Sequence, residues 1–333
     1  MAIEAVAYAR AGLIGNPSDG YHGKTVSFII RNFSAKVTFY DHHEVEIVPS
    51  VRDRSVYPTV RELVRDVSDY GYYGAIRLVK ATIKKFVEYC DANGHALSDR
   101  NFSARYRTSI PRHVGLAGSS ALVTATLRCL MDFYEVAIPK ELQPGVILSV
   151  ETDELGIAAG LQDRVIQVYE GCVFMDFDRA YMEETGHGRY EELSPALLPN
   201  LYIAYRTRLA EGSEVFHNNI RQRWQEGDTQ IIDAMQEFAS LAQEARDAID
   251  AGRSADIGPL LDRNFDLRRT LFQLSEANID LVERARSVGA SAKFAGSGGA
   301  IVGVFEDEKM FEKLLEAFEG TQTSVIRPEI AAG

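Results

Sequence analysis

The 333-residue sequence predicts a mixed α and β protein with a large apolar core. Hydrophobic residues make up 46% of the chain and charged residues 25%, which is typical of an ordinary globular protein of one or two domains. Segments of strand-like and of helix-like periodicity alternate without internal repeats. The polar, breaker-rich stretch ETGHGRYEELSP at residues 184–195 predicts a soft domain boundary near residues 180 to 195.

The N-terminal half begins with two predicted strands. Residues 4–15 and 25–40 are rich in β-branched and aromatic residues, and the turn-rich GNPSDGYHGK separates them. Apolar residues then recur every three to four positions between Tyr72 and Gly94, which predicts a helix that ends at Gly94. Residues 101–111 alternate as a strand and end at a proline.

The C-terminal half is predicted to be mainly helical. The expected elements are helices at Glu214–Gly227, Asp228–Gly252 and Asn264–Gly289, followed by a glycine-interrupted hairpin at Ser291–Phe305.

Charge and composition narrow the classes of function. A formal net charge of −12 argues against broad attraction to nucleic acid or to an anionic membrane surface, so an anionic ligand would need a locally positive pocket. No apolar run approaches the about 20 residues that span a bilayer, and we expect a soluble cytoplasmic protein. Cys90, Cys129 and Cys172 fit neither a disulfide framework nor a metal site and are expected to be core thiols.

The stretch GLAGSSALVTATL at residues 115–127 places glycines and serines directly before a helical pattern. Glycines allow close backbone approach to a ligand, and the first helical turn offers unpaired N–H groups and the positive end of the helix dipole. This combination binds phosphate. Ser119 or Ser120 could cap the helix or reach a magnesium ion. A capped helix after a glycine turn is the alternative interpretation.

Two further segments supply the other parts that phosphoryl transfer needs. ETDELGIAAGLQDRVIQVYEG at residues 151–171 places Glu151 and Asp163 on either side of a small-residue loop, and KFAGSGGAIVGVF at residues 293–305 adds another glycine-rich turn. A backbone cradle for phosphates, a carboxylate for a metal and a group that orients the attacking hydroxyl together indicate a kinase.

These motifs resemble those of the GHMP kinase superfamily in order and spacing. The first family motif corresponds to residues 9–23, the phosphate loop to residues 111–121 and the third motif to residues 293–299. The usual loop reads PxxxGLGSSAA, whereas this chain has PRHVGLAGSSA with the extra residue Ala117. The segments GNPSD, GLQDRVIQVY and NFDLRR resemble the glucuronokinase branch. The resemblance implies a two-domain α+β fold, with a ribosomal-protein-like domain at residues 1–185 and a ferredoxin-like domain at residues 186–333.

The resemblance also implies roles for individual residues. Asp163 corresponds to the catalytic aspartate that accepts or orients the substrate hydroxyl, although it could also cap the following helix. Arg10 corresponds to a basic residue beside that aspartate, and a surface strand arginine is its alternative. Ser120 and Glu151 would hold Mg²⁺, with Glu154 as the rival carboxylate.

Further contacts follow from the three motifs. The nucleotide would be contacted by Pro111, Gly115, Leu116, Ala117, Gly118, Ser119, Ser120, Ala121, Lys293, Gly296, Ser297 and Gly298. The sugar would be contacted by Asn16, Ser18, Asp19, Tyr21, Arg164 and Gly298. A uronic acid also needs a cation for its carboxylate, and the candidates are Arg164, Lys24, Arg206 and Arg268.

The expected activity is therefore ATP- and Mg²⁺-dependent phosphorylation of the anomeric hydroxyl of glucuronate, a small sugar acid. One alternative is a kinase for galacturonate, a heptose phosphate or a mevalonate-type acid. Another is a non-catalytic ATP and sugar sensor on the same fold, which the presence of Asp163, Glu151 and Ser120 disfavours. Whether the chain is a monomer or a homodimer stays open.

Overall fold

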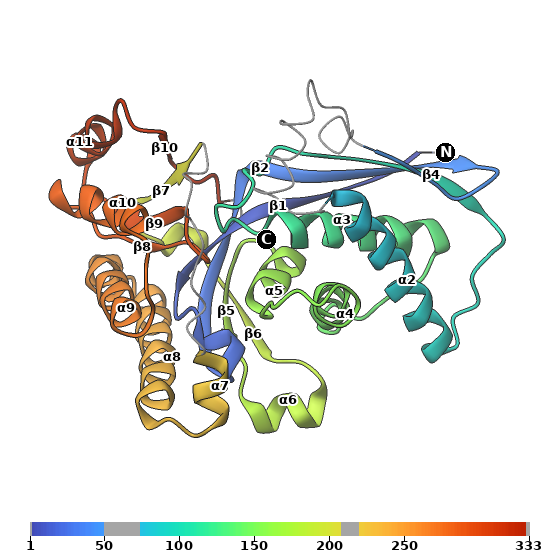
Figure 1. The fold of residues 1–333 in the computed structure, drawn as a ribbon, viewed down its shortest axis with the longest axis horizontal. Helices are drawn as coiled ribbons and strands as arrows, with labels where there is room; N and C mark the ends of the chain where they lie inside the picture. Colours follow the sequence, from blue (N-terminus) through green and yellow to red (C-terminus); the bar gives the residue numbers. More distant parts are fainter. Residues whose placement is uncertain (1, 50–73, 208–219, 331–333) are drawn as a thin grey trace. The chain divides into compact units, whose positions relative to one another are not determined.

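The chain folds into two compact units, each assembled from several segments. The computed structural model describes residues 2–49, 74–207 and 220–330. Unit 1 comprises residues 1–7, 34–109 and 118–159, and unit 2 comprises residues 8–33, 110–117 and 160–333. Two long N-terminal strands, β1 (Ala2–Ile14) and β2 (Lys24–His42), pair with each other and contribute to both units (Figure 1). The boundary between residues 185 and 186 stays a prediction.

Unit 1 combines packed helices with one end of a six-stranded sheet, whose strand order is β3-β4-β2-β5-β6 with β1 paired to β2. The second half of β2 pairs antiparallel with β4 (Asn101–Thr108), which pairs in parallel with β3 (Glu46–Val48). The stacked rings of Phe39 and Phe102, 3.9 Å apart, join these strands, and Phe133 of the helix layer packs edge-on against both. The helices that pack together are α2 (Ala75–Asn93), α3 (Gly118–Tyr134) and α4 (Gln143–Ser149), followed by the π-helical turn η3 (Val150–Glu154).

The other end of the six-stranded sheet, in unit 2, positions the helix that carries Asp163. Residues Lys24–Phe28 of β2 pair antiparallel with β5 (Cys172–Asp176), and β5 pairs with β6 (Arg189–Leu193). The short helix α5 (Gln162–Tyr169) packs on β5 through Val165 and Ile166, which lie in one core cluster with Val173 and Met175. The other elements of this part are η1 (Ser18–Tyr21), α6 (Arg179–Thr185) and η4 (Pro195–Leu197).

The second sheet of unit 2 has the order β10-β7-β9-β8, and all of its pairs are antiparallel. Its strands are β7 (Leu201–Arg206), β8 (Lys293–Phe294), β9 (Ala300–Val304) and β10 (Thr323–Ile326). Helices of this unit are α7 (Ile220–Gln225), α8 (Thr229–Asp250), η5 (Ser254–Asp256), α9 (Ile257–Leu271), α10 (Glu276–Ser287) and α11 (Glu308–Phe318). Tyr202, Phe265 and Phe294 are the large buried side chains where α9 and the sheet meet.

Most of the predicted elements are confirmed. The N-terminal strands, the helix that ends at Gly94 and the hairpin β8–β9 occur where the sequence predicts them. The predicted helix Asp228–Gly252 is α8, whose first turn is capped by Asp228. Of the predicted helix Glu214–Gly227, residues 214–219 lie outside the described residues, as do Tyr72 and Tyr73. All three cysteines are free and buried, as expected.

The prediction of one continuous helix over Asn264–Gly289 is wrong. Phe272 adopts an extended conformation that ends α9, and the Ser275 side chain accepts a hydrogen bond from the backbone N–H of Asn278, which caps α10. In the described ranges, no helix combines the length and the hydropathy needed to cross a membrane.

Candidate active site

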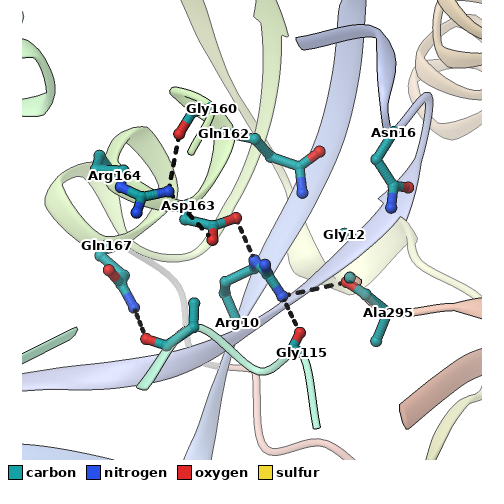
Figure 2. Close-up of polar contacts among 12 residues, drawn as sticks. Arg10, Gly12, Asn16, Gly115, Gly160, Gln162, Asp163, Arg164, Gln167 and Ala295 are labelled. Atoms are coloured by element: carbon teal, nitrogen blue, oxygen red, sulfur yellow. Dashed lines mark hydrogen bonds and ion pairs between the residues drawn. The ribbon is translucent and has the colours of Figure 1, made fainter. Parts of the chain in front are cut away.

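Asp163 and two arginines form the centre of the candidate site in unit 2 (Figure 2). Arg10, on β1, donates from Nε to Oδ1 of Asp163 at 2.6 Å, and Nη1 of Arg164 lies 3.3 Å from Oδ2. The Asp163 side chain is 19% exposed, whereas the two arginine side chains are almost fully buried. Both carboxylate oxygens therefore face a cation, and a fifth of the side-chain surface stays exposed.

The pKa of Asp163 lies below its usual value. Burial would raise it, but the positive charges of Arg10 and Arg164 and the hydrogen bond from Arg10 outweigh burial. Asp163 also lies in the first turn of α5, where the helix dipole favours negative charge. The residue before this helix is Leu161, and no side chain caps it. The alternative role of Asp163 as a helix cap is thus not observed.

Arg10 also connects Asp163 to both glycine-rich turns. Its Nη1 donates to the carbonyl oxygen of Gly115 at 2.5 Å and to that of Ala295 at 3.2 Å. A Cβ on Gly296 would lie 2.9 Å from Arg10 Nη1, so a glycine is needed against the guanidinium. Because Arg10 is buried with three partners, the alternative of a surface strand arginine is wrong.

Within unit 2 the first part of the phosphate loop packs against the third-motif turn. Gly115 has φ 70°, and a Cβ there would lie 2.9 Å from the backbone nitrogen of Ser297. Gly299 has φ 78°, and its Cβ would lie 2.9 Å from the Cα of Val114. Side chains at either glycine would separate the two turns.

The extra residue of the loop, Ala117, has φ 60°, in the left-handed region. Gln167 of α5 donates from Nε2 to the Ala117 carbonyl oxygen at 2.9 Å and to that of Tyr8 at 3.1 Å. The helix that carries Asp163 therefore also fixes the position of the phosphate loop. Beyond Ala117 the loop continues into α3, which belongs to unit 1.

The first turn of α3 contains the candidate metal-binding residues of unit 1. Ser119 Oγ donates to Oε1 of Glu151 at 2.9 Å, and Glu151 is buried in the π-helical turn η3. Ser120 is also buried, in the same turn of α3. Glu154 instead forms an ion pair with Lys84 at 2.5 Å. Of the two candidate carboxylates, Glu151 contacts the serine pair of the loop through its hydrogen bond with Ser119, whereas the contact of Glu154 in the described structure is with Lys84.

The residues predicted to contact the sugar lie in or next to η1. Ser18 Oγ is occupied within its own turn, where it accepts from the Lys24 N–H and donates to the Lys24 carbonyl oxygen. Asp19 Oδ2 accepts from the backbone N–H of Gln162 at 3.4 Å, which places its carboxylate beside the start of α5. Tyr21 packs edge-on against Trp224 of α7, with 5.6 Å between ring centroids.

The pKa of Asp19 is raised to about 6. Burial is the main cause, and the negative charge of Asp163 adds to it, while the Gln162 N–H and the charges of Arg10 and Arg164 act in the opposite direction. Asp19 and Asp163 are therefore two neighbouring carboxyl groups with different proton affinities.

Lys293, which the resemblance places at the nucleotide, directs its ammonium group into the interior. Nζ donates to the carbonyl oxygens of Gly12 and Phe294 at 2.7 and 2.8 Å and to Oδ1 of Asn16 at 2.6 Å. Burial and the nearby charges of Arg268 and Arg10 lower its pKa. The side chains of Lys293 and Asn16 thus bind each other and stabilise the turn after β1.

Several polar residues of the site were not singled out from the sequence. Asn264 accepts from the Gly15 N–H and donates to the Asn16 carbonyl oxygen, and Asn278 Oδ1 accepts from the Gly299 N–H. Gln167 was detectable as a polar residue within the apolar run of RVIQVY, because a buried polar side chain needs partners. The two asparagines carry no comparable local signal.

An ionised aspartate held by two arginines, beside two packed glycine-rich turns on an α+β scaffold, defines a phosphotransferase of the small-molecule kinase class. The family model of the GHMP kinases N terminal domain matches residues 77–171, and that of the GHMP kinases C terminal matches residues 245–321. The chain belongs to the GHMP kinase family and has its two-domain fold.

Relatives of known name lie within the same family. The chain is 44% identical over 321 residues to glucuronokinase 1 of Arabidopsis thaliana, which covers 95% of this chain and 88% of the relative. It is 45% identical over 317 residues to probable glucuronokinase 2 of the same plant, with 93% and 86% covered. Among solved structures, Lactococcus lactis galactokinase complexed with galactose matches with a TM-score of 0.77 at 17% identity, over 100% of this chain and 94% of that one.

Proposed function

We propose that this protein is an ATP-dependent kinase that phosphorylates the anomeric hydroxyl of D-glucuronate to give D-glucuronate 1-phosphate and ADP. The similarity to two plant glucuronokinases over more than nine tenths of the chain supports the substrate. The observation that carries the reaction class is the partly exposed Asp163 side chain, whose carboxylate is kept ionised by Arg10 and Arg164.

In the proposed reaction the sugar O1 attacks the γ-phosphorus of ATP in line, the bond from that phosphorus to the ADP oxygen breaks, and the O1 proton passes to Asp163. A lowered pKa makes Asp163 a weak base but keeps it ionised, so that it can orient the hydroxyl throughout the neutral range. Arg10 offsets the negative charge that gathers near this carboxylate. Backbone N–H groups of the phosphate loop would contact the phosphates.

Magnesium is part of the proposal, and the residues of unit 1 fit it. Mg²⁺ prefers hard oxygen ligands and keeps several waters, so it needs few protein groups. Glu151 supplies a buried carboxylate with the Ser119 hydroxyl 2.9 Å away, and Ser120 adds a second hydroxyl in the same turn. Among the described residues no group of three or more His, Cys, Asp or Glu side chains offers another metal site. Bound magnesium would neutralise phosphate charge.

For the sugar, Asp19 is the best placed of the predicted contacts, because its carboxylate lies beside the start of α5. The roles of Asn16, Tyr21 and Gly298 as substrate contacts remain proposals, as do a cytoplasmic location and the choice between monomer and homodimer.

The test is ADP release from MgATP with glucuronate, galacturonate, galactose, a heptose phosphate and mevalonate as substrates, together with phosphorus NMR of the product. Selective formation of an anomeric phosphate from glucuronate supports the proposal. Turnover of another member of the panel would reassign the substrate, and ATP binding without any turnover would favour a sensor.

A further inference from the structure

Arg268, near the end of α9, places a guanidinium group in the interior of unit 2. The residue is 6% exposed, and its Cζ lies 5.2 Å from the ring centroids of both Phe272 and Phe294. Nη1 donates to the carbonyl oxygen of Gly296 at 3.1 Å. Within the described residues, Nε and Nη2 have no hydrogen-bond acceptor, and no carboxylate pairs with this guanidinium.

A buried cation of this kind is costly unless an anion accompanies it. Burial lowers the pKa of Arg268 to about 10, and the negative charge of Asp19 opposes this effect only in part. At neutral pH the group is still charged. Nε and Nη2 form one edge of the guanidinium plane, and two parallel N–H groups on one edge match the two oxygens of a carboxylate.

The other cations considered for the substrate carboxylate already have protein partners. Arg164 pairs with Asp163, Lys24 lies 3.6 Å from the carboxylate of Asp176, and Arg206 donates to a main-chain carbonyl of α10. Lys293 is saturated by three oxygen acceptors. Arg206, like Arg268, has a main-chain carbonyl and no carboxylate as its partner in the described part of the chain, but it is only partly buried. Arg268 is therefore the buried cation of this set that has neither an anionic partner nor a full set of acceptors among the described residues.

Arg268 also belongs to the candidate active site. Its hydrogen-bond acceptor is the carbonyl oxygen of Gly296. Gly296 also lies against the guanidinium group of Arg10, so this glycine contacts both arginines. Arg10 in turn binds Asp163. A sugar whose O1 is at Asp163 would therefore have a second anion-binding group nearby, and in a hexuronate the carboxylate is the group on the far side of the ring oxygen from O1.

We propose that Arg268 binds the carboxylate of the sugar acid through Nε and Nη2 and determines the preference of the enzyme for a uronate over a neutral sugar. This assignment rests on the proposed function and identifies the side chain that binds the carboxylate of the substrate. The phosphates of ATP are the other anions in the reaction, and the test separates them.

The experiment compares wild type and Arg268→Met with D-glucuronate and with D-glucuronamide, which has the same shape but no charge. We expect kcat/KM for glucuronate to fall by about 10²–10³-fold, because a buried charge pair loses one partner. We expect kcat/KM for glucuronamide and the affinity for ATP without sugar to stay unchanged. Arg268→Lys should recover part of the loss, since it keeps the charge but not the fork.

Arg269→Met is the matched control, because the neighbouring arginine is exposed and pairs with Glu283 on the surface. An equal loss for glucuronate and glucuronamide, or a loss of ATP affinity without sugar, would overturn the assignment. The unfolding midpoint of the ligand-free Arg268→Met variant should not fall, since an unmatched buried charge is removed. If that variant does not fold, calorimetry on wild type decides, and equal affinity for the two sugars overturns the assignment.

The same experiment keeps the two proposals apart. If the wild-type enzyme phosphorylates glucuronate and Arg268→Met retains full activity, only the role of Arg268 is contradicted. Wild type without activity on glucuronate contradicts the proposed function, and the assignment of the carboxylate fails with it.

Discussion

Asp19 and Asp163 lie in one cluster, and the environment moves their pKa values in opposite directions. The backbone N–H of Gln162, the residue before Asp163, donates to Oδ2 of Asp19 at 3.4 Å. Asp163 has two arginines at its oxygens and a lowered pKa, whereas Asp19 is partly buried near that negative charge and has a pKa of about 6. Pairs of carboxyl groups separated in this way are typical of catalytic sites, where one holds charge and the other can carry a proton.

Replacing Asp163 by asparagine should reduce kcat by about 10²–10⁴-fold while ATP binding persists. The amide keeps the size of the side chain but can neither accept the hydroxyl proton nor match the charge of Arg10. Single-turnover ADP formation and calorimetric ATP titration measure the two effects. Asp99→Asn, at an exposed position of unit 1, is the control, and unchanged turnover in Asp163→Asn would remove this residue from the mechanism.

Asp19→Asn should stabilise the protein at alkaline pH. The folded-state pKa of about 6 exceeds the ordinary value of 3.8, so the native state binds the proton more tightly than the unfolded state. The free energy of unfolding of wild type therefore falls as the pH rises from about 4 to 6, by up to about 3 kcal/mol. The free energy of unfolding of the asparagine variant does not fall in this way, because asparagine does not titrate. Urea unfolding at pH 8 should show the full gain, which should vanish below pH 4, and the variant should bind sugar more weakly.

Removing the charge of Arg10 should move the acidic limb of the kcat profile to higher pH. Arg10 is one of the two cations that lower the pKa of Asp163, so Arg10→Met raises that pKa and protonates the carboxyl group at a higher pH. In addition kcat at its plateau should fall by about 10²–10³-fold through lost charge stabilisation. Arg10→Lys should keep the limb near its wild-type position but still lose activity, because an ammonium group cannot hold Asp163, Gly115 and Ala295 in one plane. Coincident profiles for the two variants would contradict this.

Much of the fold was predictable because its signals are local. Alternating apolar residues predicted the two N-terminal strands. Gly94 predicted a helix end because glycine readily adopts the left-handed conformation that it has here. The proximity of Asp163 and Arg10 was also predictable from the family resemblance of their motifs, although the two residues are 153 positions apart. The break between α9 and α10 was missed because a serine cap competes with a continuous apolar period. The absence of an anionic partner for Arg268 among the described residues could not be predicted from the sequence, since it depends on what packs around the side chain.

Gly160→Ala should impair sugar use without affecting ATP binding. A Cβ at Gly160 would overlap Oδ2 of Asp19, so the carboxylate must move away from the start of α5. A displacement of this size can reduce kcat/KM for the sugar by up to about 10²-fold. Gly145→Ala is a matched control in α4, because in the described ranges no atom beyond the adjacent helix backbone lies within 4 Å of a Cβ there. Equal kinetics of the two variants would show that Asp19 does not position the sugar.

Glu151→Gln should raise the magnesium concentration needed for half-maximal rate and lower kcat/KM for MgATP by about 10²-fold, since a neutral amide binds a hard dication poorly. A second readout is Mn²⁺ binding in the presence of a non-hydrolysable ATP analogue, followed by electron paramagnetic resonance. The control is Glu154→Gln, which breaks only the ion pair with Lys84 and should change the free energy of unfolding by about 1 kcal/mol or less. The two glutamates lie three residues apart on one π-helical turn, so the two variants make the same chemical change in the same local structure. If Glu154→Gln shifts the magnesium dependence and Glu151→Gln does not, the hydrogen bond between Ser119 and Glu151 is structural and the metal is held elsewhere.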